Sequence, residues 1–501
     1  MKKKQTKKPA FSLDKPPLER KTKLKSVTDP ASPLEPLTGP KPSPGPVTQP
    51  HQSKNSPSPS RPSRPSGPAP PPSCPAPPAI TLDPVQLSLF EDIEKGGLNY
   101  FIQGQAGTGK STFVKYFKSN TKKRYCVVCP TGIAAINIGG TTIHSLFQLP
   151  TNDILELTQL KLATRTQSIL SRIGVLIIDE VSMVRPDILD AIDLLAKQSR
   201  SNSLAFGGLQ MILIGDLAQL PPVIGNETKE IFKLKYGFRE PYFFDSESYK
   251  NGKFNKLEFT NIYRQIDREL MIKLSNIRSN IDVRQTIEYF NETKFTDPKF
   301  FDQAVTLTPY RKKAENINNN KLDKIPAPPR TYAATVEGKF DPEKEASSPQ
   351  WLTLKVGALV MFTRTYDSNC INGTAAFVES LDDDQITVRL VTTNNIVIVQ
   401  RTVWQKLTYQ YDITTKLIEE KVIGSFTQFP LLLCYAMTVH KSQGRTLDKV
   451  ILEIDRGAFS HGQLYVALSR TRSRADMHLN TPLKISDAIT DKRVTDFLKS
   501  C

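Results

Sequence analysis

The chain has 501 residues, a net charge of +17 and 38 prolines. This length suggests two to four domains. No apolar run approaches the roughly 18 residues of a membrane-spanning helix, so we expect no membrane partner, and Met1-Lys2-Lys3-Lys4 is not followed by the apolar stretch of a secretory signal.

Residues 1–80 differ in composition from the rest of the chain. They hold 22 of the 38 prolines, and 14 Lys or Arg against 4 Asp or Glu. Such a segment cannot bury enough apolar surface to offset its ordering entropy, so we expect a disordered, basic, proline-rich arm. The arm could contact nucleic acid or an acidic protein partner, or it could be a solvated tether; its composition leaves these roles open.

The six cysteines are scattered along the chain. Cys126 and Cys129 lie three positions apart on an apparent strand, so their side chains are expected on opposite faces. No second pair completes a zinc site. The pattern favours a reducing, intracellular compartment. Among such compartments a bacterial cytoplasm is the first choice, and a nucleus or a viral setting is the alternative.

A phosphate-binding loop, Gly-Gln-Ala-Gly-Thr-Gly-Lys-Ser, starts at Gly104. It follows the apolar run 100–102 and opens a helical stretch over 112–118, which is the context that the motif requires. The glycines let backbone N–H groups point at phosphate oxygens, while Lys110 supplies a charge and Ser111 a hydroxyl for Mg²⁺. The residues expected to bind a nucleoside triphosphate are Gly104, Gln105, Ala106, Gly107, Thr108, Gly109, Lys110, Ser111 and Thr112.

Further apolar runs at 125–129, 175–178 and 211–214 alternate with helical patterns. Unbroken apolar strands between helices predict an α/β fold with a parallel sheet covered on both faces. A second set of such runs appears near 305–308 and 430–436. Between residues 355 and 427 the strands become short and alternating, which predicts a small antiparallel barrel inserted into a second α/β domain.

Polar residues follow the apolar runs at the edge where parallel sheets bind ligands. Asp179 and Glu180 close one run; buried carboxylates are costly unless they serve a metal and a water. Asp179 is expected to hold Mg²⁺ and Glu180 to orient or deprotonate the attacking water. Gln219 follows the next run and can reach a γ-phosphate.

Phosphoryl transfer also needs positive charge at the γ-phosphate, and arginines commonly supply it. Arg264 in Tyr-Arg-Gln and Arg470 in Ala-Leu-Ser-Arg fit this role, and both lie in the second α/β half.

Seven motifs occur in one order: Gly-Gln-Ala-Gly-Thr-Gly-Lys-Ser, Pro-Thr-Gly-Ile-Ala-Ala, Ile-Asp-Glu-Val-Ser-Met, Gly-Asp-Leu-Ala-Gln-Leu-Pro-Pro, Tyr-Arg-Gln, Thr-Val-His-Lys-Ser-Gln-Gly and Tyr-Val-Ala-Leu-Ser-Arg. From about Leu82 to Arg472, this order resembles the petite-integration-frequency (PIF) type superfamily 1B DNA helicases. The segment after Met183 looks closer to the bacterial-type members of that family.

The resemblance implies two RecA-like P-loop domains with ATP between them. The first would span 81–256, with a wedge-bearing insertion at about 146–165. The second would span 257–354 and 428–501, and its insertion, 355–427, would be a small SH3-like barrel.

The resemblance also implies roles for single residues. ATP and Mg²⁺ would be the cofactors, with Ser111 and Asp179 at the metal, Gln86 reading adenine and Gly444 bordering the nucleotide cleft. The catalytic set would be Lys110, Asp179, Glu180, Gln219, Arg264 and Arg470. The residues bordering the DNA strand would be Thr131, Gly132, Ala134, His144, Thr438, His440 and Lys441.

The activity implied is ATP-driven 5′-to-3′ translocation on single-stranded DNA by a monomer, with unwinding of forked duplex DNA. Such an enzyme would serve DNA replication, repair, recombination, or telomere and genome maintenance. Three alternatives share parts of the sequence evidence: a DNA-stimulated ATPase that translocates without unwinding, a nucleic-acid scaffold with an inactive ATPase fold, and an interaction protein that acts through its arm.

Overall fold

The structure, a computed structural model, describes residues 81–499 except 151–153, 155–156, 158–159, 227, 293–297, 368–369, 413 and 416. The predicted arm, 1–80, lies outside the described residues, as does part of the predicted wedge, 146–165. The described residues all fall within one unit of the chain, Pro77–Cys501. Among them, no helix has both the length and the apolar character that a bilayer span requires.

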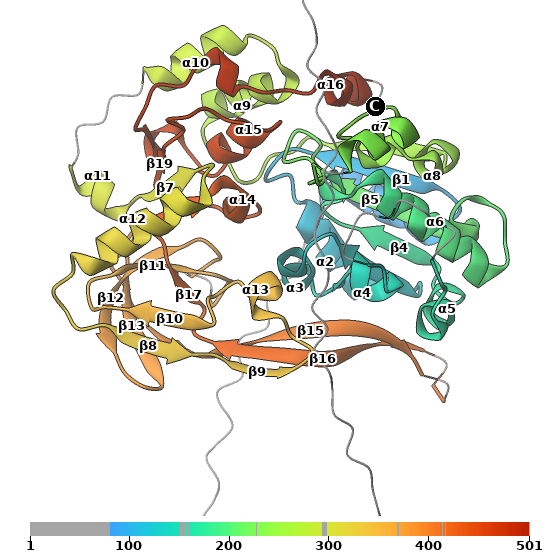
Figure 1. Cartoon of the computed structure of the whole chain (residues 1–501), viewed down its shortest axis with the longest axis horizontal. Coiled ribbons are helices and arrows are strands. Elements are labelled where there is room, and N and C mark those ends of the chain that lie inside the picture. Colours follow the sequence, from blue (N-terminus) through green and yellow to red (C-terminus); the bar gives the residue numbers. More distant parts are fainter. Residues whose placement is uncertain are drawn as a thin grey trace, which may run out of the picture. The chain divides into compact units, whose positions relative to one another are not determined.

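The first sheet has six strands: β1 (Asn99–Gly104), β2 (Tyr125–Cys129), β3 (Thr141–Thr142), β4 (Val175–Ile178), β5 (Gln210–Gly215) and β6 (Phe254–Phe259). They are parallel and lie in the order β3-β2-β4-β5-β1-β6 (Figure 1). β4 and β5 are buried along their whole length, as their apolar sequences predict. The expected domain boundary at residue 256 falls inside β6, whose pairing with β1 continues to Phe259. β6 is a partly exposed edge strand without an apolar run, so its sequence pattern did not predict a strand there.

Helices cover both faces of this sheet: α1 (Pro84–Lys95), α2 (Lys110–Asn120), α3 (Gly132–Ile138), α4 (Ile143–Phe147), α5 (Thr164–Leu170), α6 (Pro186–Arg200), α7 (Lys229–Tyr236) and α8 (Glu247–Asn251). Alternate strand residues enter two separate cores. Cys126 and Val128 pack with residues of α5 and α6, whereas Val127 and Cys129 pack with residues of α1 and α2. The two cysteines therefore face opposite sides of the sheet, as their spacing predicted. This sheet with its helices is the first lobe.

The second sheet has four strands: β7 (Val305–Thr308), β18 (Ala436–Thr438), β19 (Val450–Leu452) and β20 (Met477–Leu479). They are parallel and lie in the order β18-β7-β19-β20, so both predicted parallel sheets are present. The surrounding helices, which complete the second lobe, are α9 (Arg268–Ser279), α10 (Val283–Asn291), α11 (Pro298–Gln303), α12 (Arg311–Asp323), α14 (Val439–Ser442) and α15 (Gln463–Leu468).

The last helix, α16 (Lys492–Lys499), packs on the first lobe rather than on the second. The ring of Phe497 stacks on Phe244 with centroids 4.3 Å apart and lies 5.7 Å from Phe101 of β1, and Val494 is buried in the same core. The expected assignment of all of 428–501 to the second lobe therefore does not describe this helix. An eight-residue amphipathic helix shows in its sequence that one face is buried, but not which surface buries it.

An antiparallel β insertion interrupts the second lobe. Its elements are β8 (Arg330–Ala333), β9 (Thr335–Gly338), α13 (Pro342–Glu345), β10 (Trp351–Leu354), β11 (Leu359–Phe362), β12 (Ala375–Leu381), β13 (Gln385–Leu390), β14 (Ile396–Gln400), β15 (Thr402–Tyr411), β16 (Ile418–Gln428) and β17 (Leu431–Leu433). It extends beyond the expected 355–427 on both sides. β9 pairs with β16, and β17 pairs with β11; such pairings between distant segments leave no signal in a local pattern.

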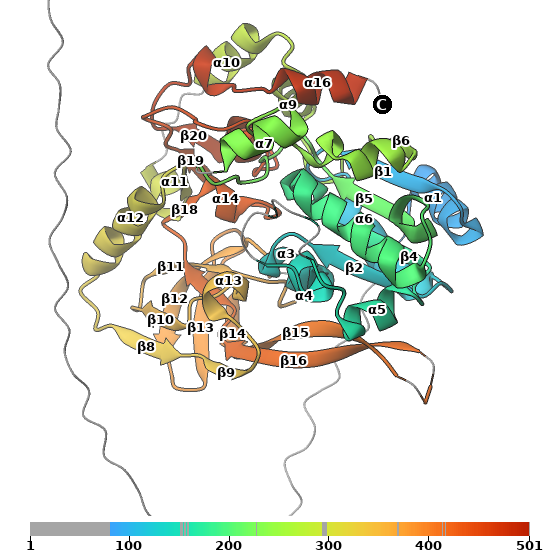
Figure 2. The ribbon, with the colours of Figure 1, turned by 45° about the vertical axis from the view of Figure 1, so that its right-hand side comes forward.

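The hairpin of β15 and β16 extends from the insertion to the first lobe, and both views show it running beneath that lobe (Figures 1 and 2). The Tyr409 hydroxyl accepts the N–H of Val127 in β2 at 3.0 Å, and the Arg165 guanidinium donates to the Tyr409 carbonyl. Lys118 and Glu420 form an ion pair at 3.1 Å. The insertion is thus attached to the first lobe as well as to the second.

Candidate ATP and DNA site

The phosphate loop joins β1 to α2, so its N–H groups gather at a helix N-terminus, where anions are stabilised. Gly107 and Gly109 have φ values of +89° and +83°, a left-handed region that favours glycine. Gly107 is constrained twice, because a Cβ there would lie 2.4 Å from the Cβ of Arg264. The Tyr263 N–H also donates to the Gly107 carbonyl at 2.8 Å. The loop therefore packs closely against the segment that leads into the second lobe.

Lys110 begins α2, and its ammonium group folds back onto the loop. Its Nζ donates to the carbonyls of Gly104 at 2.6 Å and Gln105 at 2.9 Å. Burial lowers the pKa of Lys110, and the nearby carboxylates, Asp216 first among them, only partly offset this effect. A bound phosphate would add a direct counter-charge to this ammonium group, whose hydrogen bonds here are to neutral carbonyls.

Asp179 and Glu180 follow β4 at the same edge of the sheet. Burial, and after it the charge of Glu180, raises the pKa of Asp179 to about 7, and burial raises that of Glu180. Glu180 has a left-handed φ of +55°, which a non-glycine residue adopts at a cost of about 1–2 kcal/mol, and strain of this kind is concentrated at functional sites. Its Oε2 is buried without a hydrogen-bond partner among the described residues.

These carboxylates fit a magnesium ion that is shared with phosphate oxygens. Ser111 lies in the exposed first turn of α2, where a hydroxyl can reach such an ion. Among the described residues, no group of three or more His, Cys, Asp or Glu could hold a metal by itself. Mg²⁺ typically binds through one or two carboxylates together with substrate phosphates, and Ser111 with Asp179 matches that usage.

Two arginines approach the loop from the second-lobe side. Arg264 is half-buried beside Gly107. Arg470 is 1% exposed and donates to the carbonyls of Val466, Ser442 and Arg445 at 2.7–3.2 Å. Burial, and after it the charge of Arg264, lowers the pKa of Arg470 to about 9. Two neighbouring cations, one buried and one half-buried, favour an anion between them.

Three further predicted residues lie around the loop. Gln86 is buried in α1, and its Nε2 donates to the Thr108 carbonyl at 3.2 Å, so in this structure it supports the loop. Gln219 Nε2 donates to Asp216, and its Oε1 accepts from Gln443 Nε2 at 3.1 Å. Gly444 is exposed with a φ of +77° and open space beside it.

The predicted DNA residues lie on both lobes in matching local geometry. Thr131 follows β2 and caps α3, accepting the Ala134 N–H at 3.3 Å. Thr438 ends β18 and caps α14, accepting the Lys441 N–H at 3.3 Å. Each lobe thus presents a threonine-capped short helix after a parallel strand.

The other predicted DNA residues differ in exposure. His440 and Lys441 are exposed at the start of α14, whereas His144 is half-buried, and burial lowers its pKa. Gly132 faces the insertion, because a Cβ there would lie 2.7 Å from Glu345 Cγ of α13.

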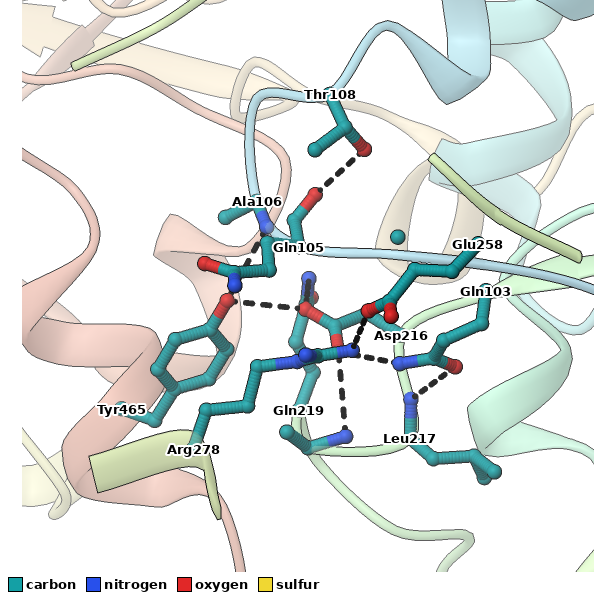
Figure 3. A network of polar contacts seen from close by, with 12 residues as sticks. Gln103, Gln105, Ala106, Thr108, Asp216, Leu217, Gln219, Glu258, Arg278 and Tyr465 are labelled. Atoms are coloured by element: carbon teal, nitrogen blue, oxygen red, sulfur yellow. Dashed lines mark hydrogen bonds and ion pairs between the residues drawn. The ribbon is translucent and has the colours of Figure 1, made fainter. Parts of the chain in front are cut away.

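Three site residues received no role from the sequence: Asp216, Tyr465 and Arg278. Figure 3 shows them in one polar network with Gln103, Gln219 and the phosphate loop. The Ala106 N–H donates to the Tyr465 hydroxyl at 3.1 Å, and that hydroxyl donates to Asp216 at 3.2 Å. Asp216 and Tyr465 lie within recognised motifs, which could have marked them. Arg278 lies in no motif that the sequence analysis singled out.

Comparison with known proteins matches this site. Residues 81–282 match the family model for PIF1-like helicases. The ATP-dependent DNA helicase Pif1 of Bdellovibrio bacteriovorus is 31% identical over 432 residues, which cover 84% of this chain and 92% of that protein. The chain belongs to the PIF1-like helicase family. The expected resemblance, including its bacterial-type character, is confirmed.

Solved structures of the family confirm the fold of this PIF1-like helicase. Pif1 from Bacteroides sp in complex with ADP-AlF4 is 35% identical, with a TM-score of 0.76 over 84% of this chain and 97% of that one. The two RecA-like domains with an inserted SH3-like barrel are therefore present as predicted. Bacteroides Pif1 bound to ssDNA, 34% identical over the same shares of both chains, gives a TM-score of 0.59. The structure thus resembles the complex with ADP-AlF4 more than the complex with ssDNA.

Proposed function

We propose that this PIF1-like helicase hydrolyses ATP at the contact between its lobes, moves 5′-to-3′ on single-stranded DNA and unwinds forked duplexes. One observation carries the proposal: the phosphate loop of the first lobe touches residues of the second-lobe side, Arg264 at Gly107 and Tyr465 at Ala106. A loop with such contacts binds nucleotide differently when the lobes approach or separate. By linkage, nucleotide binding and release then move the lobes.

The residues of the loop and those around it divide the chemistry among them. Lys110 exchanges its two carbonyl contacts for phosphate oxygens, and Glu180 orients the attacking water and accepts its proton. Burial raises the pKa of Glu180, which makes it a better proton acceptor near neutral pH than an exposed carboxylate. Mg²⁺ held by Ser111 and Asp179 would neutralise phosphate charge. Arg264 and Arg470 stabilise the charge that develops on the γ-phosphate.

Contacts of Arg470 link this chemistry to DNA. Its guanidinium donates to the carbonyl of Ser442, the last residue of α14, and the same short helix carries the exposed His440 and Lys441. A DNA strand that shifts α14 therefore shifts the support of Arg470. This connection provides a physical route for DNA to stimulate hydrolysis.

We propose that the DNA strand crosses both lobes along the two threonine-capped helices, contacting Thr131, Gly132, Ala134, His144, Thr438, His440 and Lys441. A relative of this chain, Bacteroides Pif1, was solved bound to ssDNA. Contacts to the phosphate backbone make such binding weaken with salt.

We further propose that the enzyme works as a monomer in an intracellular compartment and serves DNA replication, repair or recombination. The four cysteines among the described residues are free and buried, as in a reducing environment. The arm, 1–80, would engage a protein partner or nucleic acid.

A polarity-resolved unwinding assay tests the function. Forked duplexes with only a 5′ tail or only a 3′ tail are incubated with the full chain, with and without ATP. We expect strand separation from the 5′ tail alone, only with ATP, and none with Lys110→Ala. DNA-stimulated hydrolysis without strand separation would replace the proposal by a translocase, and absence of hydrolysis would replace it by a scaffold.

A further inference from the structure

Asp216 is a fully buried carboxylate at the carboxyl end of β5, between the two lobes. Its Oδ1 accepts from Gln103 Nε2 and from the Ala218 N–H, both at 3.2 Å. Its Oδ2 accepts from Gln219 Nε2 at 3.0 Å and from the Tyr465 hydroxyl at 3.2 Å (Figure 3). Asp216 therefore positions two side chains: Gln219, and the tyrosine that holds the Ala106 amide of the phosphate loop.

Arg278 supplies a positive charge to this carboxylate from the second lobe. It lies on α9, is 8% exposed, and its Nε is 3.5 Å from Asp216 Oδ1. Its second anchor is Glu258 of β6, to which Nη2 donates at 2.8 Å. Burial alone would lower the pKa of Arg278, but Asp216 and further partners more than offset it, so the pKa is raised. The guanidinium is thus a permanent cation beside a buried anion.

The charge of Asp216 also reaches the phosphate loop. The Tyr465 hydroxyl that donates to Asp216 also accepts the Ala106 N–H of this loop, so one side chain separates the carboxylate from the loop. A triphosphate brings several negative charges to the same loop. An unneutralised Asp216 would then repel the nucleotide, since charges interact strongly where water is excluded.

We propose that Arg278 is a positioning residue of the ATPase: it neutralises Asp216, so that Asp216 can hold Gln219 and Tyr465 at the phosphate loop while an anionic triphosphate is bound. Arg278 acts through Asp216, with no contact of its own to the nucleotide. The inference rests on the proposed ATP hydrolysis, and it adds a third second-lobe arginine to the site.

The test is a charge-rescue cycle with R278M, D216N and the double variant in the full chain. R278M leaves Asp216 buried without its positive counter-charge, a change that is strongly destabilising in buried ion pairs. We expect kcat/KM for ATP to fall about 30-fold or more. Asparagine removes the uncompensated charge and keeps a similar shape, so the double variant should regain at least about tenfold over R278M.

The ratio of ATP to ADP affinity separates this role from a structural one. ATP carries one more phosphoryl group than ADP, so an unneutralised Asp216 should weaken ATP binding more than ADP binding, by about tenfold in the ratio. A loosened fold would weaken both nucleotides alike. The D216N/R278M variant should restore the wild-type ratio, and R278K, which keeps the charge, should stay nearer to wild type than R278M does.

R268M is the matched control, because Arg268 is an exposed arginine on the same helix. We expect it to keep the wild-type kcat, KM and affinity ratio. If R278M fails to fold, the ratios of ATP to ADP affinity in D216N and R278K still test the inference. The inference is overturned if R278M leaves the ratio unchanged or if the double variant shows no rescue. Absence of hydrolysis in the wild-type chain would instead overturn the proposed function.

Discussion

The Tyr465 hydroxyl joins the phosphate loop to the second lobe. It accepts the N–H of Ala106, 359 positions earlier in the chain, at 3.1 Å, and it donates to the Asp216 carboxylate at 3.2 Å. One phenol thus holds a loop amide and a buried acid together. The geometry of the phosphate loop therefore depends on the second lobe.

Tyr465→Phe keeps the buried ring and removes both hydrogen bonds. A buried amide without a partner costs about 1–3 kcal/mol, so we expect the free energy of unfolding to fall by about that amount. The kcat/KM for ATP should fall roughly tenfold, equivalent to about 1.4 kcal/mol, because the Ala106 amide of the loop loses its hydrogen bond to the tyrosine. Urea unfolding and steady-state ATPase assays measure the two effects.

Tyr435→Phe is the matched control for this variant. The Tyr435 hydroxyl also accepts a backbone N–H, that of Leu359, at 2.9 Å, but it lies in the insertion's contact with the second lobe and away from the loop. The Tyr435→Phe variant should therefore lose stability and keep its ATPase activity unchanged. Equal activity losses in both variants would show that Tyr465 acts through stability alone.

Lys110→Ala should abolish ATP hydrolysis and leave DNA binding largely intact. The lysine is the only residue of the loop that supplies a mobile cation to the phosphates, whereas the DNA residues lie on other helices. ATPase assays and fluorescence anisotropy with single-stranded DNA measure both properties. Turnover comparable to wild type would contradict the assignment.

Arg264→Ala should spare ATP binding and slow hydrolysis about a hundredfold or more, as arginine fingers act on the transition state. Alanine keeps the Cβ that packs on Gly107, so the phosphate loop should retain its shape. Equilibrium binding of a nonhydrolysable ATP analogue and single-turnover hydrolysis separate the two steps. Weak binding with normal turnover would refute this role.

Gly107→Ala should impair ATP binding by more than backbone strain explains. Its Cβ would lie 2.4 Å from that of Arg264, which forces the loop and the second-lobe segment apart. Gly97→Ala is the control, because Gly97 also has a left-handed φ, +94°, but has nothing within 4 Å of the added Cβ. We expect at least a tenfold weaker ATP affinity, more than 1.4 kcal/mol, in the first variant only. Equal ATP affinities in the two variants would mean that the contact between Gly107 and Arg264 is unimportant for ATP binding.

Asp179→Asn should change how stability depends on pH. Burial and the charge of Glu180 raise the pKa of Asp179 to about 7, so the folded chain holds this proton more tightly than the unfolded chain, whose aspartates have a pKa of about 4. Ionisation of Asp179 then destabilises the fold progressively as the pH rises from about 4 to about 7.

We therefore expect the Asn variant to be more stable than wild type at pH 8, by on the order of 2 kcal/mol, with the difference shrinking toward pH 4.5. Urea unfolding without Mg²⁺ or nucleotide measures it at each pH. A difference that does not vary with pH would show that Asp179 is not held in a raised-pKa state.

The chemistry of the site could be predicted because its groups lie within short segments. The phosphate loop needs only residues 104–111, and the acidic pair only the two positions after β4. An unbroken apolar run likewise predicts a buried strand from its own residues. The order of the motifs then identified the family, with its inserted barrel.

The sequence by itself therefore determined the reaction and the lobes that carry it. The tertiary structure alone decided which groups meet between those lobes: Tyr465 with Ala106, Arg278 with Asp216, and α16 with the first-lobe core. These contacts join residues that lie far apart in the chain. A local pattern records whether a residue is buried or charged, but not its distant partner, so one arginine among many shows its role only when folding places it beside a buried carboxylate.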